Sequence, residues 1–164
     1  RLQRGDRPWH RDDGQHHSNL PAGSIHTTVL ETATEGSLWL PKTGGATDVV
    51  FHFTKGRIER IEAASGAEVL DEMFDSHSGE PRRVSHIGLG LNPYLRRPIG
   101  WTLVDEHIHG ALFIAFGENR YMGGQNESSL NIDYSLPGTT LKIAGQTVVF
   151  EGKIVLEGES DGNG

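Results

Sequence analysis

The chain has 164 residues, the length of one ordinary domain, and carries 22 acidic residues against 15 lysines and arginines. The resulting net charge of −7 argues against a nucleic-acid partner, since a duplex binder needs a basic face to displace counterions from phosphates. The absence of cysteine excludes disulfides, thiolate metal sites and a cysteine nucleophile. No apolar run approaches the roughly 20 residues that cross a bilayer, and no signal peptide is visible, so we expect a cytoplasmic protein without a membrane partner.

Glycine accounts for 22 residues, and turns that contain glycine separate short runs rich in β-branched side chains. The predicted strands in chain order are Ile25–Glu31, Ser37–Leu40, Val49–Phe53, Arg57–Ala63, Val84–Leu91, Ala111–Phe116, Leu141–Ile143, Thr147–Phe150 and Ile154–Leu156. Two pairs of these strands flank tight turns, at Thr54–Gly56 and at Ala144–Gln146, which is typical of hairpins. Because strands follow strands, the sequence predicts an α+β fold dominated by antiparallel β structure.

One helix is predicted, over Ser65–Phe74. Ser65 and Glu68 have the spacing of a capping box, in which each side chain binds the backbone of the other residue. Leu70, Met73 and Phe74 recur at positions i, i+3 and i+4 and predict an apolar stripe that faces the core.

The chain is expected to form one domain over residues 19–156. Residues 1–18 are polar and predict an extended segment or an edge strand, in which the pair His16-His17 is more typical of a solvated loop than of a ligand pair. Residues 157–164 are acidic and rich in glycine, which predicts a flexible tail. Because the chain begins with Arg1 rather than methionine, we expect a fragment or a processed product.

The first candidate for chemistry is His86, which lies in an otherwise apolar strand between Ser85 and two glycines, Gly88 and Gly90. Glycine inside a strand indicates that another group approaches the backbone closely. A histidine in such a strand must have its ring nitrogens satisfied, either as a core residue bonded to a carbonyl or as a metal ligand.

Two further pairs have the spacing of metal ligands. His107 and His109 are two residues apart, so they would share one face of a strand and form a metal clip. Asn131 and Asp133 have the same spacing, and their oxygens suit a hard or borderline cation. The alternative for the second pair is a turn-capping role before Pro137.

Three stretches together resemble a known family: NLPAGSIHTTVLETATEGSLWLP, SHIGLGLNP and DEHIHGALFIAFGENRYMGGQNESSLNID. In the same order, they resemble the C-terminal domain of the aminopeptidase T-like family of thermophilic metallopeptidases, which includes leucyl aminopeptidases. The resemblance implies a longer protein with an N-terminal α/β domain that is absent here. It also implies a homodimer.

Peptidases of this family bind two divalent metals through two glutamates, two histidines and an aspartate, with a tyrosine nearby. The resemblance places these positions on Ser24, His86, Phe113, Asn131 and Asp133, with the tyrosine at Tyr121. Only Tyr121 and Asp133 keep the expected chemistry. A two-metal hydrolase needs enough anionic ligands to hold both cations, so these departures argue against an intact dinuclear site.

The related 2,5-dihydroxypyridine dioxygenase branch departs from the peptidases in a similar way. Its members resemble this chain in the SHIGxG motif, whose histidine binds iron, and in an apolar residue where Phe113 stands. They keep a histidine two residues before the aspartate, where this chain has Asn131. The resemblance therefore implies a mononuclear iron site with His86 and Asp133 as ligands and weakened affinity, with His26 and His107 as candidates for a third ligand.

Three hypotheses remain open. The chain is an aminopeptidase-type hydrolase with an altered metal site, a non-haem Fe(II) dioxygenase-like enzyme, or a non-catalytic relative that retains the fold for binding or assembly. The cofactor is zinc, cobalt or iron, or no metal is retained, and the substrate is a small molecule or a short peptide. Tyr121 would stabilise developing negative charge, Ser24 would contact substrate, and Arg96 and Arg97 would attract a carboxylate.

Overall fold

The computed structural model describes residues 21–155 of the chain. The predicted segment 1–18, with the pair His16-His17, and the predicted tail 157–164 lie outside the described residues. The described part forms two compact units. The first consists of residues 26–87 and 114–133, and the second of residues 21–25, 88–113 and 134–155.

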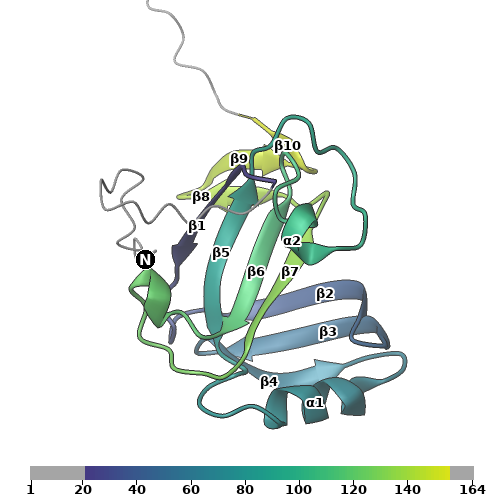
Figure 1. Cartoon of the computed structure of the whole chain (residues 1–164), viewed down its shortest axis with the longest axis vertical. Coiled ribbons are helices and arrows are strands. Elements are labelled where there is room, and N and C mark those ends of the chain that lie inside the picture. Colours follow the sequence, from purple (N-terminus) through teal and green to yellow (C-terminus); the bar gives the residue numbers. More distant parts are fainter. Residues whose placement is uncertain (1–20, 156–164) are drawn as a thin grey trace, which may run out of the picture. The chain divides into compact units, whose positions relative to one another are not determined.

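The first unit contains a three-stranded antiparallel sheet in the order β2-β3-β4. The elements are β2 (Gly36–Thr43), β3 (Ala46–Thr54), β4 (Arg57–Glu62) and the helix α1 (Ala67–Asp75), which runs along this sheet (Figure 1). Strands β3 and β4 form the predicted hairpin, because Lys55 and Gly56 both have positive φ, at 51° and 78°. A two-residue turn with positive φ at both positions matches the twist of the strands that it joins.

Helix α1 begins two residues later than predicted and without the expected capping box. Its N-cap is Gly66 in the left-handed conformation, and no side chain caps the helix. Ser65 Oγ instead lies 2.9 Å from Thr47 Oγ1, so this hydroxyl binds strand β3 rather than the start of the helix. The predicted apolar stripe is confirmed at Leu70 and Phe74, which are both buried, whereas Met73 is only half-buried.

Four phenylalanine rings form the centre of this unit. Phe51 of β3 meets Phe74 of α1 and Phe116 edge to face, with ring centroids 5.9 and 5.8 Å apart. Phe53 stacks on Phe116 at 5.7 Å. Phe51, Phe74 and Phe116 have no exposed surface, so these contacts tie the helix and the sheet to one apolar core.

A four-stranded sheet has the order β1-β5-β6-β7 (Figure 1). Its strands are β1 (Ser24–Thr28), β5 (Val84–Gly90), β6 (Leu112–Gly117) and β7 (Asn131–Leu136), and each gives residues to both units. A short 3₁₀ helix, Arg120–Met122, follows β6. Strand β7 was not among the predicted strands, because its polar residues before Pro137 also fit a turn.

The second unit contains a second three-stranded antiparallel sheet, in the order β10-β9-β8. Its strands are β8 (Leu141–Ile143), β9 (Gln146–Phe150) and β10 (Lys153–Ile154), and a one-turn helix, α2, spans Thr102–Asp105. The mostly antiparallel α+β fold predicted from the sequence is confirmed. Among residues 21–155, no helix is long and apolar enough to span a bilayer.

Replacing Phe116 with alanine tests the importance of the aromatic core. The change removes a ring that contacts three others, so we expect a loss of about 3–5 kcal/mol in the free energy of unfolding, measured by urea denaturation. The control is Phe150→Ala, since Phe150 is 52% exposed and should cost less than about 0.5 kcal/mol. Equal losses for the two variants would contradict the central place of Phe116 in the core.

Candidate metal-binding site

Two of the predicted metal ligands, His86 and Asp133, meet in the first unit. His86 Nε2 of β5 lies 3.0 Å from Asp133 Oδ1 of β7. Strand β6 lies between β5 and β7 in the sheet, so the two backbones are separated by about two strand spacings, or 9–10 Å. Both side chains therefore extend toward each other over β6. The His86 side chain is 6% exposed and that of Asp133 is 23% exposed, so the pair is largely shielded from water.

The other nitrogen of the His86 ring is held by the preceding residue. His86 Nδ1 lies 2.9 Å from Ser85 Oγ, and Ser85 Oγ donates a hydrogen bond to the backbone carbonyl of Glu118 at 3.0 Å. Ser85 is completely buried. The Nδ1 side of the His86 ring is thus bonded to a hydroxyl that is itself bonded to a carbonyl.

The donor chemistry of this pair fits one divalent metal ion. Two donors that each lie about 2.1 Å from a metal, at right angles, are about 3.0 Å apart, which is the separation of Nε2 and Oδ1. Asp133 Oδ1 is also buried and accepts no hydrogen bond of normal geometry from the described residues. A bound cation would satisfy this oxygen.

The pair alone does not make a complete ligand set. No cluster of three or more histidine, aspartate or glutamate side chains suited to a metal occurs within residues 21–155. The His26 ring, on β1, is tilted toward the His86 ring with centroids 5.7 Å apart, so His26 is the neighbouring imidazole in this unit. Any further ligands would come from Asn131, water or substrate.

Asn131 and Tyr121 form a second pair next to the first. Asn131 Nδ2 donates a hydrogen bond to the Tyr121 hydroxyl at 3.3 Å. Asn131 and Asp133 are two residues apart on β7, so their side chains share one face of the sheet. The turn-capping alternative for this pair is therefore wrong, because both residues lie in a strand. The structure brings four predicted residues together in two contacting pairs: His86 with Asp133, and Tyr121 with Asn131.

A buried amide network supports the backbone beside His86. Asn119 has no exposed surface, and its Nδ2 donates to the Ser85 carbonyl at 3.0 Å and to Glu31 Oε1 at 3.1 Å. Its Oδ1 accepts a hydrogen bond from the Asn126 backbone at 2.8 Å. Asn119 thus fixes the backbone at residue 85, one position before the candidate ligand.

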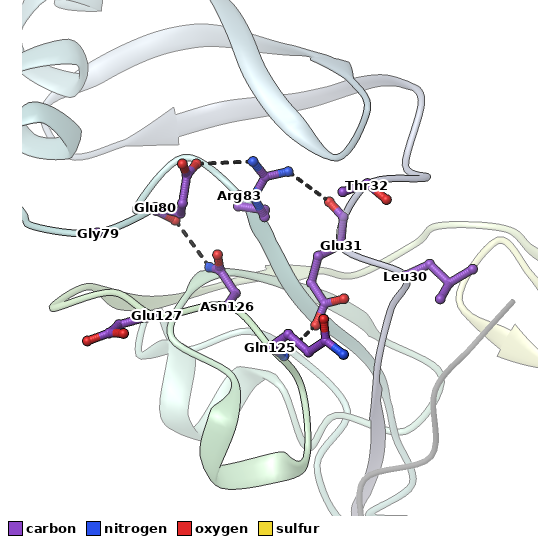
Figure 2. A pocket seen from close by; sticks show the side chains of 9 residues that line it. All are labelled: Leu30, Glu31, Thr32, Gly79, Glu80, Arg83, Gln125, Asn126 and Glu127. Atoms are coloured by element: carbon purple, nitrogen blue, oxygen red, sulfur yellow. Dashed lines mark hydrogen bonds and ion pairs between the residues drawn. The ribbon is translucent and has the colours of Figure 1, made fainter.

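An open hollow of about 610 Å³ lies at the outer end of this network. Figure 2 shows Arg83 between the Glu80 carboxylate and the Glu31 backbone carbonyl, with Gln125 against the Glu31 side chain. Burial by itself would raise the pKa of Glu31, but hydrogen bonds from Gln125 and Asn119 and the charge of Arg83 together lower it below its usual value. Each acidic or amide group of the network is thus engaged with protein partners.

Phe113, which the family resemblance places where the peptidases carry a histidine, is buried in the second unit. The ring is buried, and a Cβ added to Gly88 would come within 2.0 Å of its Cζ. A Cβ added to Gly90 would come within 2.1 Å of the Ile108 carbonyl. These contacts confirm that the two strand glycines mark close approaches.

The other predicted residues lie elsewhere in the second unit. Ser24 is half-buried on β1, and Arg96 and Arg97 are exposed in the loop after β5. Their roles stay predictions. The metal clip proposed for His107 and His109 depended on a strand and is wrong, because both residues lie in turns after α2.

The profile of the 2,5-dihydroxypyridine 5,6-dioxygenase (NicX) family matches residues 16–156. The chain belongs to this family. It is similar to the structure of a 2,5-dihydroxypyridine dioxygenase from Pseudomonas putida KT2440, with a TM-score of 0.65, 23% identity, and 79% of this chain and 42% of that chain covered. It is also similar to AmpT from Thermus thermophilus, with a TM-score of 0.60, 23% identity, and 84% and 40% covered.

At 23% identity, these two likenesses support a shared fold and no more. Both branches indicated by the sequence motifs, the dioxygenase and the aminopeptidase, are found among the relatives. The chain spans about two fifths of the length of either solved relative. No curated protein sequence matches it.

The sequence motifs did not reveal the residues that hold His86 in place. Ser85 was visible only as part of SHIGLG, and Asn119 only as one of the polar residues after β6. Buried side chains of this kind act through contacts with residues more than 30 positions away. The one signal in the sequence was an asparagine two residues after an apolar strand, since a buried amide needs several hydrogen-bond partners.

Acid should destabilise the protein through His107, which is 2% exposed. Burial lowers the pKa of His107 below its usual 6.5, although a backbone hydrogen bond at Leu103 opposes the shift. The unfolded chain then binds this proton more readily, so stability is lost as the pH falls below about 6.5. We expect His107→Gln to lose less stability than the wild type between about pH 7 and pH 5, measured by urea denaturation. Equal losses would contradict the assignment.

Proposed function

We propose that this chain forms the metal-binding part of a non-haem Fe(II) dioxygenase that cleaves a hydroxylated aromatic ring. The observation that carries the proposal is the approach of His86 Nε2 to Asp133 Oδ1 at 3.0 Å, in a chain of the NicX family. Membership of that family suggests a metal cofactor. An imidazole and a carboxylate are two of the three ligands in iron sites of the two-histidine, one-carboxylate type.

Two features favour one metal over two. The first is Phe113, which stands at the position where the peptidases have a histidine ligand. Its buried ring packs over Gly88, and a phenyl ring has no donor atom for a metal. Asp133 is the single carboxylate among the positions that the family resemblance assigns to ligands. One carboxylate does not balance two divalent cations, so the aminopeptidase-type hydrolase becomes the alternative that metal analysis must exclude.

The remaining residues have roles suited to their chemistry. Bound iron would supply the redox centre at which dioxygen and the ring react. Tyr121, held through its oxygen by Asn131, would donate a hydrogen bond to negative charge on the substrate. Ser24, Arg96 and Arg97 belong to the second unit, and their contacts with substrate stay predictions. Asn131 offers an amide oxygen where the related dioxygenases have a histidine, so the proposed iron affinity is low.

Metal analysis of the whole chain tests this proposal. Anaerobic titration with Fe(II) should show one equivalent bound, and His86→Ala should weaken that binding by about 10-fold or more. Oxygen uptake with a dihydroxypyridine, lost in His86→Ala, would support the ring-cleaving activity. Two equivalents of zinc or cobalt would contradict the proposal and support the hydrolase. If no metal binds and His86→Ala changes only the stability, the proposal is contradicted and the non-catalytic hypothesis is favoured.

Restoring the missing histidine should strengthen metal binding. Asn131 and Asp133 share a face of β7, so a histidine at position 131 would lie beside the carboxylate. We expect Asn131→His to bind Fe(II) about 10-fold more tightly or better than the wild type, since imidazole is a stronger ligand than an amide oxygen. The control is Ile132→His, which adds the same side chain to the opposite face of the strand. An equal gain in both variants would contradict the assignment of position 131.

A further inference from the structure

The hydroxyl of Ser85 has only one proton, and its partners determine where that proton goes. The backbone carbonyl of Glu118 can only accept a hydrogen bond, so at 3.0 Å the Ser85 hydroxyl must donate to it. The same oxygen then has no proton for the His86 ring and can only accept. At 2.9 Å, His86 Nδ1 must therefore carry the hydrogen and donate it to Ser85.

This assignment decides the role of the other ring nitrogen. A neutral imidazole carries one hydrogen, so with that hydrogen on Nδ1 the lone pair is on Nε2. Nε2 is the atom that faces Asp133 Oδ1 at 3.0 Å. We propose that Ser85 is a positioning residue that holds His86 in the Nδ1–H tautomer, with the Nε2 lone pair directed at the metal position. This inference rests on the proposed function only for its consequence in metal binding.

Ser85 is needed because Asp133 alone would favour the opposite tautomer. A carboxylate oxygen next to Nε2 accepts a hydrogen bond, which would place the hydrogen on Nε2 and remove the lone pair that a metal requires. The hydroxyl of Ser85 competes with this tendency from the other side of the ring. Asn119 supports this role of Ser85, since its side-chain amide donates to the Ser85 carbonyl and keeps Ser85 in register on β5.

The protein contains a natural control for this arrangement at the end of helix α1. Ser76 and His77 are also adjacent, Ser76 Oγ donates to the Met73 carbonyl at 2.7 Å, and it lies 3.2 Å from His77 Nδ1. This second serine–histidine pair is exposed. Ser76→Ala thus removes the same local contact without touching the candidate site.

Nitrogen-15 NMR of histidine-labelled, metal-free protein measures the tautomer directly, at a pH where the His86 ring is neutral. We expect the hydrogen on Nδ1 in the wild type, in Ser85→Thr and in Ser76→Ala, and on Nε2 in Ser85→Ala. A wild-type ring with its hydrogen on Nε2 would overturn the proposal, even if the variants fail to fold. An unchanged tautomer in folded Ser85→Ala would also overturn it.

Metal titration gives the second readout. Ser85→Ala should weaken Fe(II) binding by about 10- to 100-fold, and Ser85→Thr should restore most of it. Weakening that Ser85→Thr fails to rescue would overturn the role of the hydroxyl. If the wild type binds no metal, the proposed function fails, while the tautomer measurement still decides the role of Ser85.

Discussion

The candidate site depends on one contact between side chains that start far apart. His86 and Asp133 lie on strands separated by β6, and their side chains meet at 3.0 Å. Such a contact requires that both side chains have fixed directions, because a free imidazole would turn toward water. Ser85 fixes the ring through the Glu118 carbonyl, and Asn119 fixes the backbone of Ser85. The geometry of the pair therefore comes from buried hydrogen bonds around it.

Much of the fold was predictable from local sequence patterns. The hairpin at Lys55 and Gly56 was predictable because a residue followed by glycine between two apolar strands suits a two-residue turn. The apolar stripe of α1 was predictable from its period. The start of that helix was not, because Ser65 Oγ has a tertiary partner, Thr47, which competes with the capping box.

The site was less accessible from the sequence, and for a physical reason. Strand context and spacing gave His86 and Asp133 only as candidate ligands beside a structural alternative, and the family resemblance was needed to pair them. Strand β7, which carries Asp133, was missed because its polar residues also fit a turn. Pairing with β6 makes this segment a strand, and pairing is a tertiary effect that a local pattern does not contain. The spacing of His107 and His109 led to a wrong prediction of a metal clip, since this spacing suits a clip only in extended backbone and both residues lie in turns.

The residues at the ligand positions distinguish this chain from the peptidases, and Asn131 distinguishes it from the related dioxygenases as well. Phe113 has an apolar ring at a position where the peptidases have a metal ligand. Asn131 has an amide, a weaker ligand, where the related dioxygenases have a histidine. Asn131 instead holds the Tyr121 hydroxyl, so the position contributes to a hydrogen bond near the proposed metal. The proposed centre therefore has a strong pair of protein ligands and weak further ligands, and substrate or water would complete the coordination.

The central claim is that His86 binds one metal ion through Nε2 while Ser85 holds its Nδ1–H. Proton NMR of the Co(II)-loaded chain tests this most directly, because a paramagnetic ion strongly shifts the exchangeable proton of a coordinated imidazole. We predict one such shifted, exchangeable resonance, which disappears in His86→Ala. The absence of a shifted exchangeable resonance, or its persistence in His86→Ala, would contradict the claim.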